Sequence, residues 1–129
     1  MNIQVRQATE NDLQAIYDLV IELAVYENEP DAVEASFEDY QNDIKAGRFE
    51  SIVATQNEEV VGMMLYFQAY STWKGRMIYL DDFVVKQSHR RLGVGQVLFD
   101  QFVQIAQEQD AKVIKWQVLD WNEPAIKFY

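Results

Sequence analysis

The chain has 129 residues with a formal net charge of −10, five glycines, two prolines and no cysteine. This length fits a single domain over residues 1–129, and the lack of cysteine excludes disulfides, thiolate metal sites and a cysteine nucleophile. The acidic balance disfavours nucleic acid and anionic membranes as partners, because both are bound through positive charge. No apolar run is long enough to span a membrane and the N-terminus lacks a secretory signal pattern, so a cytoplasmic protein is expected.

The first part of the chain predicts one strand and two helices. Residues 3–7 alternate in polarity, as a strand does. The next segment is a helix that should end before Pro30. Its apolar face has the helical period and consists of Leu13, Ile16, Tyr17, Val20 and Leu23. A shorter second helix begins at Ser36 and should stop near Gly47.

The second part of the chain predicts a meander followed by a helical crossover. Strands are expected over residues 49–56, 60–70, 76–85 and 112–119. The first three should form an antiparallel meander. The helix from Gly95 to about Gln109 should bring the last strand parallel to its neighbour. A final helix is capped by Asn122, and the order β-α-α-β-β-β-α-β-α indicates a mixed α/β domain.

The run SHRRLGVGQVLF, residues 88–99, predicts an anion site between a strand and a helix. Glycine lets the backbone approach a ligand closely, and a helix N-terminus favours phosphate. Arg90 and Arg91 add charge in a chain with only eleven Lys and Arg residues. The P-loop pattern is absent, and the dinucleotide fingerprint fails because Leu98 replaces its third glycine. On this run alone, an ordinary basic turn is an equal alternative.

Arg90-x-x-Gly93-x-Gly95 resembles the signature of the GCN5-related N-acetyltransferase (GNAT) superfamily. Four blocks in order resemble its diamine (spermidine/spermine) and thialysine acetyltransferase branch: LAVYENEP (23–30), WKGRMIYLDDFVV (73–85), HRRLGVG (89–95) and LDWNEPAIKFY (119–129). The resemblance implies a mixed, mostly antiparallel sheet flanked by helices, with one parallel, splayed strand pair. It also implies direct transfer of acetyl from acetyl-CoA to a primary amine of a small cationic substrate, such as a polyamine or thialysine. A CoA-binding sensor or regulatory module without turnover is the alternative.

The resemblance places acetyl-CoA along one strand and the following turn. The pantetheine arm would lie against the main chain of Phe83, Val84 and Val85. The turn that would bind the pyrophosphate consists of Arg90, Arg91, Leu92, Gly93, Val94 and Gly95. Asn122 matches an asparagine beside the cofactor, and it would also serve as a plain helix N-cap. No metal is expected.

The same resemblance suggests the groups that move protons. Tyr129 matches the tyrosine that protonates the departing thiolate, with simple packing on the last helix as the alternative. Asp81 and Asp82 are the nearest carboxylates, and either could bind a cationic substrate or relay a proton through water. Strand alternation should point them to opposite faces, so they are not expected to act as a pair. Asp81 stands where the family often has Glu, which is one methylene longer.

Three further residues match positions around the amine pocket of this branch, namely Tyr26, Glu27 and Trp73. Trp73 could give a cation–π contact to an ammonium group, and an exposed turn aromatic or a dimer contact is the alternative. By resemblance, a homodimer is expected. Family members continue past the position of Tyr129 into a turn and a final strand, so a chain truncated at the C-terminus and lacking that strand is expected.

Overall fold

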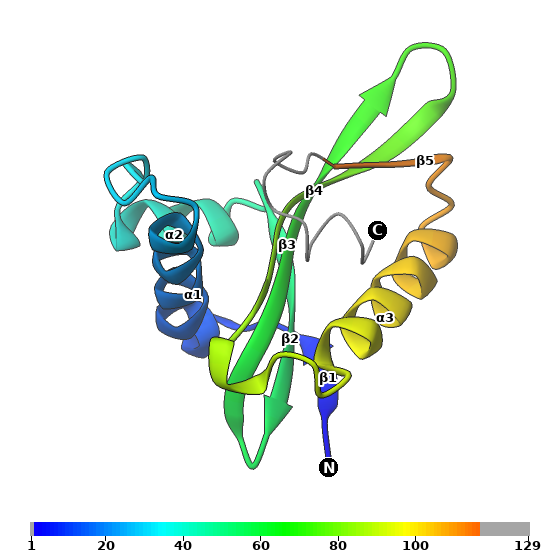
Figure 1. Cartoon of the computed structure of the whole chain (residues 1–129). Helices are drawn as coiled ribbons and strands as arrows, with labels where there is room; N and C mark the ends of the chain where they lie inside the picture. The colour runs from blue at the N-terminus through cyan, green and yellow to red at the C-terminus, as the bar shows by residue number, and fades with distance from the viewer. Residues whose placement is uncertain (1, 117–129) are drawn as a thin grey trace.

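A single sheet of five strands runs between helices on both of its faces in the computed structural model, which describes residues 2–116 (Figure 1). In chain order the elements are β1 (Gln4–Gln7), the short 3-10 helix η1 (Glu10–Asp12), α1 (Leu13–Tyr26), α2 (Phe37–Lys45), β2 (Glu50–Gln56), β3 (Glu59–Ser71), β4 (Gly75–Val85), the 3-10 helix η2 (Gln87–His89), α3 (Val94–Glu108) and β5 (Val113–Trp116). Among these helices, none is long and apolar enough to cross a bilayer. The helix expected at Asn122 and the end of the last expected strand lie outside the described residues.

The strand order of the sheet is β1-β2-β3-β4-β5. The first four strands pair antiparallel, whereas β5 pairs parallel with β4, from Met77 opposite Val113 to Leu80 opposite Trp116. The connection from β4 to β5 runs through α3, as a parallel pair requires. The predicted meander and the predicted parallel strand are therefore both confirmed.

The two faces of the sheet are covered by different helices, as Figure 1 shows. Alternate side chains of the strands pack in two buried cores. The core under α3 contains Ile52, Ala54, Val61, Met64, Tyr66, Ile78, Leu80, Val94, Leu98, Phe102 and Ala106. The core under α1 and α2 contains Leu13, Ile16, Leu19, Val20, Val53, Met63, Leu65 and Val84. The site described below lies where both layers reach the end of β4.

Gly62 on β3 allows α3 to lie directly on the sheet. A Cβ atom at this position would lie 3.1 Å from side-chain atoms of both Val94 and Leu98, and 3.2 Å from the carbonyl oxygen of Val84. No side chain fits that space without movement of a neighbour. The close approach fixes the first turns of α3 beside the end of β4.

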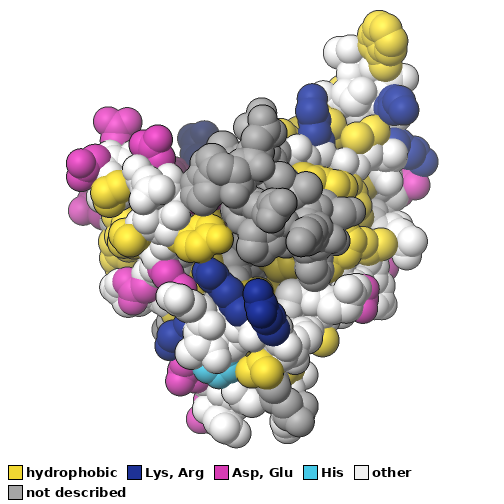
Figure 2. Space-filling model, viewed as in Figure 1, with side chains coloured by type: hydrophobic (Ala, Val, Ile, Leu, Met, Phe, Trp, Pro, Cys, Tyr) yellow, Lys and Arg dark blue, Asp and Glu magenta, His cyan; other side chains and the backbone are white. Residues whose placement is uncertain are grey.

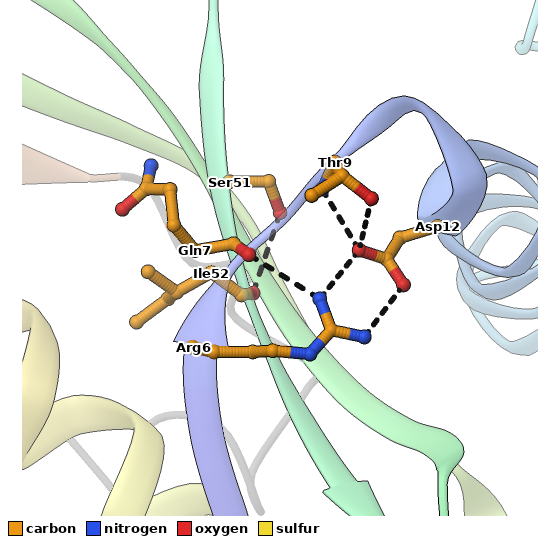
Figure 3. A network of polar contacts seen from close by, with 6 residues as sticks. All are labelled: Arg6, Gln7, Thr9, Asp12, Ser51 and Ile52. Atoms are coloured by element: carbon orange, nitrogen blue, oxygen red, sulfur yellow. Dashed lines mark hydrogen bonds and ion pairs between the residues drawn. The ribbon is translucent and has the colours of Figure 1, made fainter.

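A buried carboxylate, Asp12, holds the corner between β1 and α1 (Figure 3). Arg6 of β1 donates to both of its oxygens, with Nη1–Oδ2 and Nη2–Oδ1 distances of 2.7 and 3.0 Å. The backbone N–H of Thr9 donates to Oδ2 at 2.8 Å, as a capping box requires. The hydrogen bonds from Arg6, and those from Thr9, lower the pKa of Asp12.

Candidate active site

A β-bulge interrupts β4 at its two carboxylates. Leu65 and Tyr66 are neighbours on β3, and they pair with Asp82 and Leu80. Asp81 is therefore an extra residue on β4 with no partner of its own in this ladder. Bulges of this kind often lie beside active sites, where they change the direction of a side chain.

The bulge changes the face that Asp82 occupies. Its cross-strand neighbour Leu65 packs in the core under α1 and α2, so Asp82 lies on that same face. Leu80, two positions earlier, packs in the opposite core. The unbroken alternation expected for Asp81 and Asp82 is interrupted by this bulge, and the charge of Asp81 contributes to the raised pKa of Asp82.

A phase shift in the sequence signals this bulge. The side chains of Ile78 and Leu80 pack in the core under α3, and so do those of Phe83 and Val85. Positions on one face of a regular strand differ by an even number, whereas Leu80 and Phe83 are three apart. The apolar pattern of RMIYLDDFVV thus contains the evidence for an extra residue.

An acidic cluster of Glu27, Asp81 and Asp82 forms between the end of α1 and the bulge. Burial raises the pKa of Asp82 to about 7, with further contributions from the charges of Asp81 and Glu27. Burial also raises the pKa of Asp81 and, together with the charge of Glu29, that of Glu27. A carboxyl that titrates near neutral pH can both bind an ammonium ion and take a proton from it.

Tyr40 of α2 borders the acidic cluster, and the sequence did not identify it as a site residue. Its ring meets that of Tyr17 edge to face, with centroids 5.0 Å apart, and that of Phe49 with centroids 5.7 Å apart. The pKa of Tyr40 is raised to about 12, mainly by burial. The charges of Asp82, Tyr17 and Asp81 raise it further, in that order. Tyr40 therefore stays neutral beside the carboxylates.

The turn between β4 and α3 has the backbone geometry that an anion site needs. Arg91 and Gly93 adopt positive φ values of 66° and 86°, and Gly93 is the N-cap of α3. The first hydrogen bond of α3 runs from the Val97 N–H to the Gly93 carbonyl, at 3.2 Å. The N–H groups before Val97 have no acceptor within the helix, as at every helix N-terminus, so the turn offers donors to an anion.

The second half of β4 presents backbone groups to the edge away from β3. The Lys86 N–H donates to the Val61 carbonyl of β3 at 2.8 Å. Alternation along an antiparallel ladder then directs the backbone groups of Phe83 and Val85 to the opposite edge. Within residues 2–116, the pairing of β5 covers that edge only as far as Leu80. The predicted splay beyond this point falls outside the described residues.

The two neighbouring arginines of the turn have different surroundings. The Arg90 side chain faces α1, with its Nη2 3.8 Å from Oε1 of Glu22 and its guanidinium carbon 5.1 Å from the ring centroid of Tyr26. Its Nε donates to the Val85 carbonyl at 3.1 Å. Arg91 is exposed and makes no ion pair or hydrogen bond with any other residue of the described part. Nothing in the sequence links Glu22 to Arg90, so the sequence did not predict Glu22 as a residue of the site.

Trp73 lies apart from the acidic cluster. It belongs to the short connection between β3 and β4, at the tip of a hairpin that projects from the molecule (Figure 1), and it is 94% exposed. Tyr26 and Glu27, by contrast, lie at the end of α1 near the turn and the cluster. Asn122 and Tyr129 are outside the described residues, so their roles stay predictions.

The distribution of charge suits a ligand with an anionic end and a cationic partner. Figure 2 shows Lys and Arg side chains in the middle of one face, where the segment between β4 and α3 lies, and Asp and Glu side chains on the side of α1 and α2. Among residues 2–116, no three His, Asp or Glu side chains are placed to hold a metal ion. The site therefore joins an anion turn, the outer edge of β4 and an acidic cluster.

Comparison with protein families and curated sequences identifies relatives of the whole chain. The sequence model of the Acetyltransferase (GNAT) family matches residues 13–129. Thialysine N-epsilon-acetyltransferase of Bos taurus is 35% identical over 98% of this chain and 81% of its own length. The protein of that name from Caenorhabditis elegans is 29% identical over 99% of this chain and 80% of its own length. Human spermidine/spermine N(1)-acetyltransferase-like protein 1 is 31% identical over 98% of this chain and 19% of its own.

Solved structures share the fold at lower identity. An aminoglycoside acetyltransferase from an uncultured soil metagenomic sample superposes with a TM-score of 0.84 at 20% identity, over 98% of this chain and 84% of that chain. A probable acetyltransferase gives a TM-score of 0.85 at 23% identity, over 98% and 85% of the two chains. Both confirm the fold class.

Proposed function

Because this chain belongs to the GNAT family of acetyltransferases, we propose that it moves the acetyl group of acetyl-CoA to a primary amine of a small cationic substrate. The observation that carries the substrate class is the acidic cluster of Glu27, Asp81 and Asp82 beside the strand edge. Relatives are named for thialysine and for spermidine or spermine, and an amine of that kind is the substrate class proposed.

The turn suits the charged pyrophosphate of acetyl-CoA, and the strand edge suits its extended pantetheine arm. The N–H groups at the start of α3 and the exposed guanidinium of Arg91 would hold the pyrophosphate, with Leu92, Gly93, Val94 and Gly95 supplying the turn. The outward backbone of Phe83 and Val85, with Val84 between them, would pair with the pantetheine arm as an added strand does. Asn122 beside the cofactor remains part of the proposal.

The proposed chemistry is direct transfer without a covalent enzyme intermediate. Asp82, or Asp81 in the bulge, takes a proton from the bound ammonium, because only the neutral amine is a nucleophile. The amine nitrogen attacks the thioester carbon, and an outward N–H of the Phe83–Val85 segment stabilises the oxyanion. The carbon–sulfur bond then breaks and Tyr129 gives the leaving thiolate a proton. The nitrogen loses its second proton as the amide forms, and this proton restores the Tyr129 phenol. Tyr26 and Glu27 complete the proposed amine pocket. Trp73, exposed at the hairpin tip and apart from the acidic cluster, is not part of it.

A thiol-release assay with acetyl-CoA and a panel of amines tests this function. Small diamines, polyamines and thialysine are expected to release CoA, whereas neutral and anionic amino compounds are not. Gly93→Asp is the cofactor control, since aspartate tolerates a positive φ but adds negative charge at the phosphate turn. It should weaken acetyl-CoA binding by about tenfold or more, equivalent to about 1.4 kcal/mol.

Two outcomes of this assay contradict the proposal in different ways. Acetyl-CoA binding without thiol release from any amine would indicate a CoA-binding module instead of an enzyme. No acetyl-CoA binding at all, or unchanged binding by Gly93→Asp, would refute the turn as the cofactor site. A homodimer and a cytoplasmic location stay predictions from the sequence.

A further inference from the structure

Arg90 connects three elements through one side chain. Its Nε donates to the Val85 carbonyl at the end of β4, while its Nη2 lies 3.8 Å from Glu22 and its guanidinium covers the ring of Tyr26. Glu22 and Tyr26 are four residues apart on α1, so they share the helix face that meets the turn. A planar guanidinium suits this arrangement, because it can donate at its rim while its flat face stacks on an aromatic ring.

Glu22 strengthens the same connection from the helix side. Its Oε1 also accepts the backbone N–H of Gln87, at 3.1 Å, in the segment that leads from β4 to the turn. One carboxylate of α1 thus holds both the backbone and the Arg90 side chain of that segment. The contact lies one helical turn before Tyr26 and Glu27, and the charge of Glu27 reaches Asp82.

We infer that Arg90 is a positioning residue for the amine half of the site, and that Arg91 alone supplies the guanidinium for the cofactor phosphates. Engagement of phosphate by the Arg90 side chain would break its contacts with Val85, Glu22 and Tyr26. Arg91, exposed and unbonded within residues 2–116, has no such contacts to lose. The kinetic test of this inference rests on the proposed function. Its structural prediction, a change in hydrogen exchange at the end of α1, does not depend on that function.

The kinetic test compares Arg90→Gln with the matched variant Arg91→Gln. Arg90→Gln should raise the amine KM by roughly tenfold, because loss of the Arg90 contacts would misplace the end of α1 that carries Tyr26 and Glu27. It should leave the acetyl-CoA Kd, measured by calorimetry, within about twofold of wild type. Arg91→Gln should do the reverse, weakening acetyl-CoA binding with little effect on the amine KM.

Glu22→Gln provides a second route if Arg90→Gln fails to fold. It should also raise the amine KM and spare the acetyl-CoA Kd. The double variant Arg90→Gln/Glu22→Gln should raise the amine KM by less than the product of the two single effects, because both single variants remove the Arg90–Glu22 contact. A variant that merely loosened the fold would change both constants. Loss of acetyl-CoA affinity in Arg90→Gln, with an unchanged amine KM, would overturn the inference.

Hydrogen exchange separates failure of this inference from failure of the proposed function. The Glu27 amide donates to the Leu23 carbonyl at 2.9 Å and reports on the end of α1. Arg90→Gln should increase its exchange rate while Arg91→Gln does not. If wild type acetylates no amine, the proposed function fails, and this exchange measurement still decides the inference. Equal exchange in wild type and Arg90→Gln would overturn it.

Discussion

Asp12 and Asp82 show that one type of side chain acquires opposite properties from its surroundings. Hydrogen bonds from Arg6 lower the pKa of Asp12, whereas burial near Asp81 and Glu27 raises that of Asp82 to about 7. The first carboxylate is held ionised and serves the fold. The second exchanges its proton near neutral pH, where proton transfer from an amine needs it.

Ionisation of Asp82 should lower the free energy of unfolding as the pH rises. The folded state holds the Asp82 proton to about pH 7, whereas an unfolded chain releases it near pH 4. The contribution of Asp82 to stability is therefore fully present below about pH 4 and is lost as the pH rises through about 7. The asparagine of Asp82→Asn cannot ionise. The free energy of unfolding of the variant, relative to that of wild type, should therefore increase from pH 4 to pH 8.

Urea unfolding at several pH values measures this difference. Asp18→Asn, at an exposed position of α1, is the control for removing one carboxylate. A difference between Asp82→Asn and wild type that does not change from pH 4 to pH 8 would show that the pKa of Asp82 is not raised.

At the scale of elements, a hydrogen-bonded ion pair joins β1 to the start of α1. β1 has only four residues, and one of its side chains, Arg6, donates twice to the buried Asp12 ahead of α1. Fixed at this corner, α1 carries Glu22, Tyr26 and Glu27 at its far end. The corner and the Arg90 contacts therefore hold the two ends of the same helix.

Asp12→Asn should lower the free energy of unfolding at neutral pH by about 1.5–3 kcal/mol, the range for a lost hydrogen bond to a charged group. Because the pKa of Asp12 is lowered in the folded protein, its contribution is present above pH 4 and is lost as the pH falls through the lowered value. The gap between wild type and variant should therefore narrow in acid. Denaturant titrations at pH 7 and pH 3 test this, and an equal gap at both would contradict it.

At the scale of the whole molecule, the site depends on how closely the α3 layer approaches the sheet. Gly62 permits that approach, and the turn that would hold the cofactor phosphates begins at the helix end packed against it. The α1 and α2 layer supplies the acidic cluster from the other face. The two halves of the proposed reaction are thus brought together by opposite faces of one strand.

Gly62→Ala should lower the free energy of unfolding by about 1–3 kcal/mol, the usual cost of extra volume in a packed core. Its Cβ would meet Val94, Leu98 and the Val84 carbonyl at 3.1–3.2 Å, and a carbonyl of the sheet cannot move aside as a side chain does. Displacement of α3 should also weaken acetyl-CoA binding. Wild-type stability together with wild-type affinity, measured by urea unfolding and calorimetry, would contradict the close packing.

Most of the fold could be predicted from the sequence, because period, caps and turns are local signals. Ser36 and Gly47 marked the second helix, and the helical crossover fixed β5 parallel to β4. The site was predicted less completely. Glu22 and Tyr40 gain their roles from side chains distant in sequence, and no local pattern reports such contacts. The different surroundings of Arg90 and Arg91 likewise exist only in three dimensions.

The bulge at Asp81 has a consequence for insertions and deletions. A regular strand cannot lose a residue from its middle without turning every later side chain to the other face. In β4, removal of residue 81 would leave Leu80 opposite Tyr66 and Asp82 opposite Leu65, each on its present face. The core would keep its contacts while the acidic cluster lost one member. The packing of the fold needs one residue fewer in β4 than the proposed site does. The extra residue in this strand therefore serves the site and not the core.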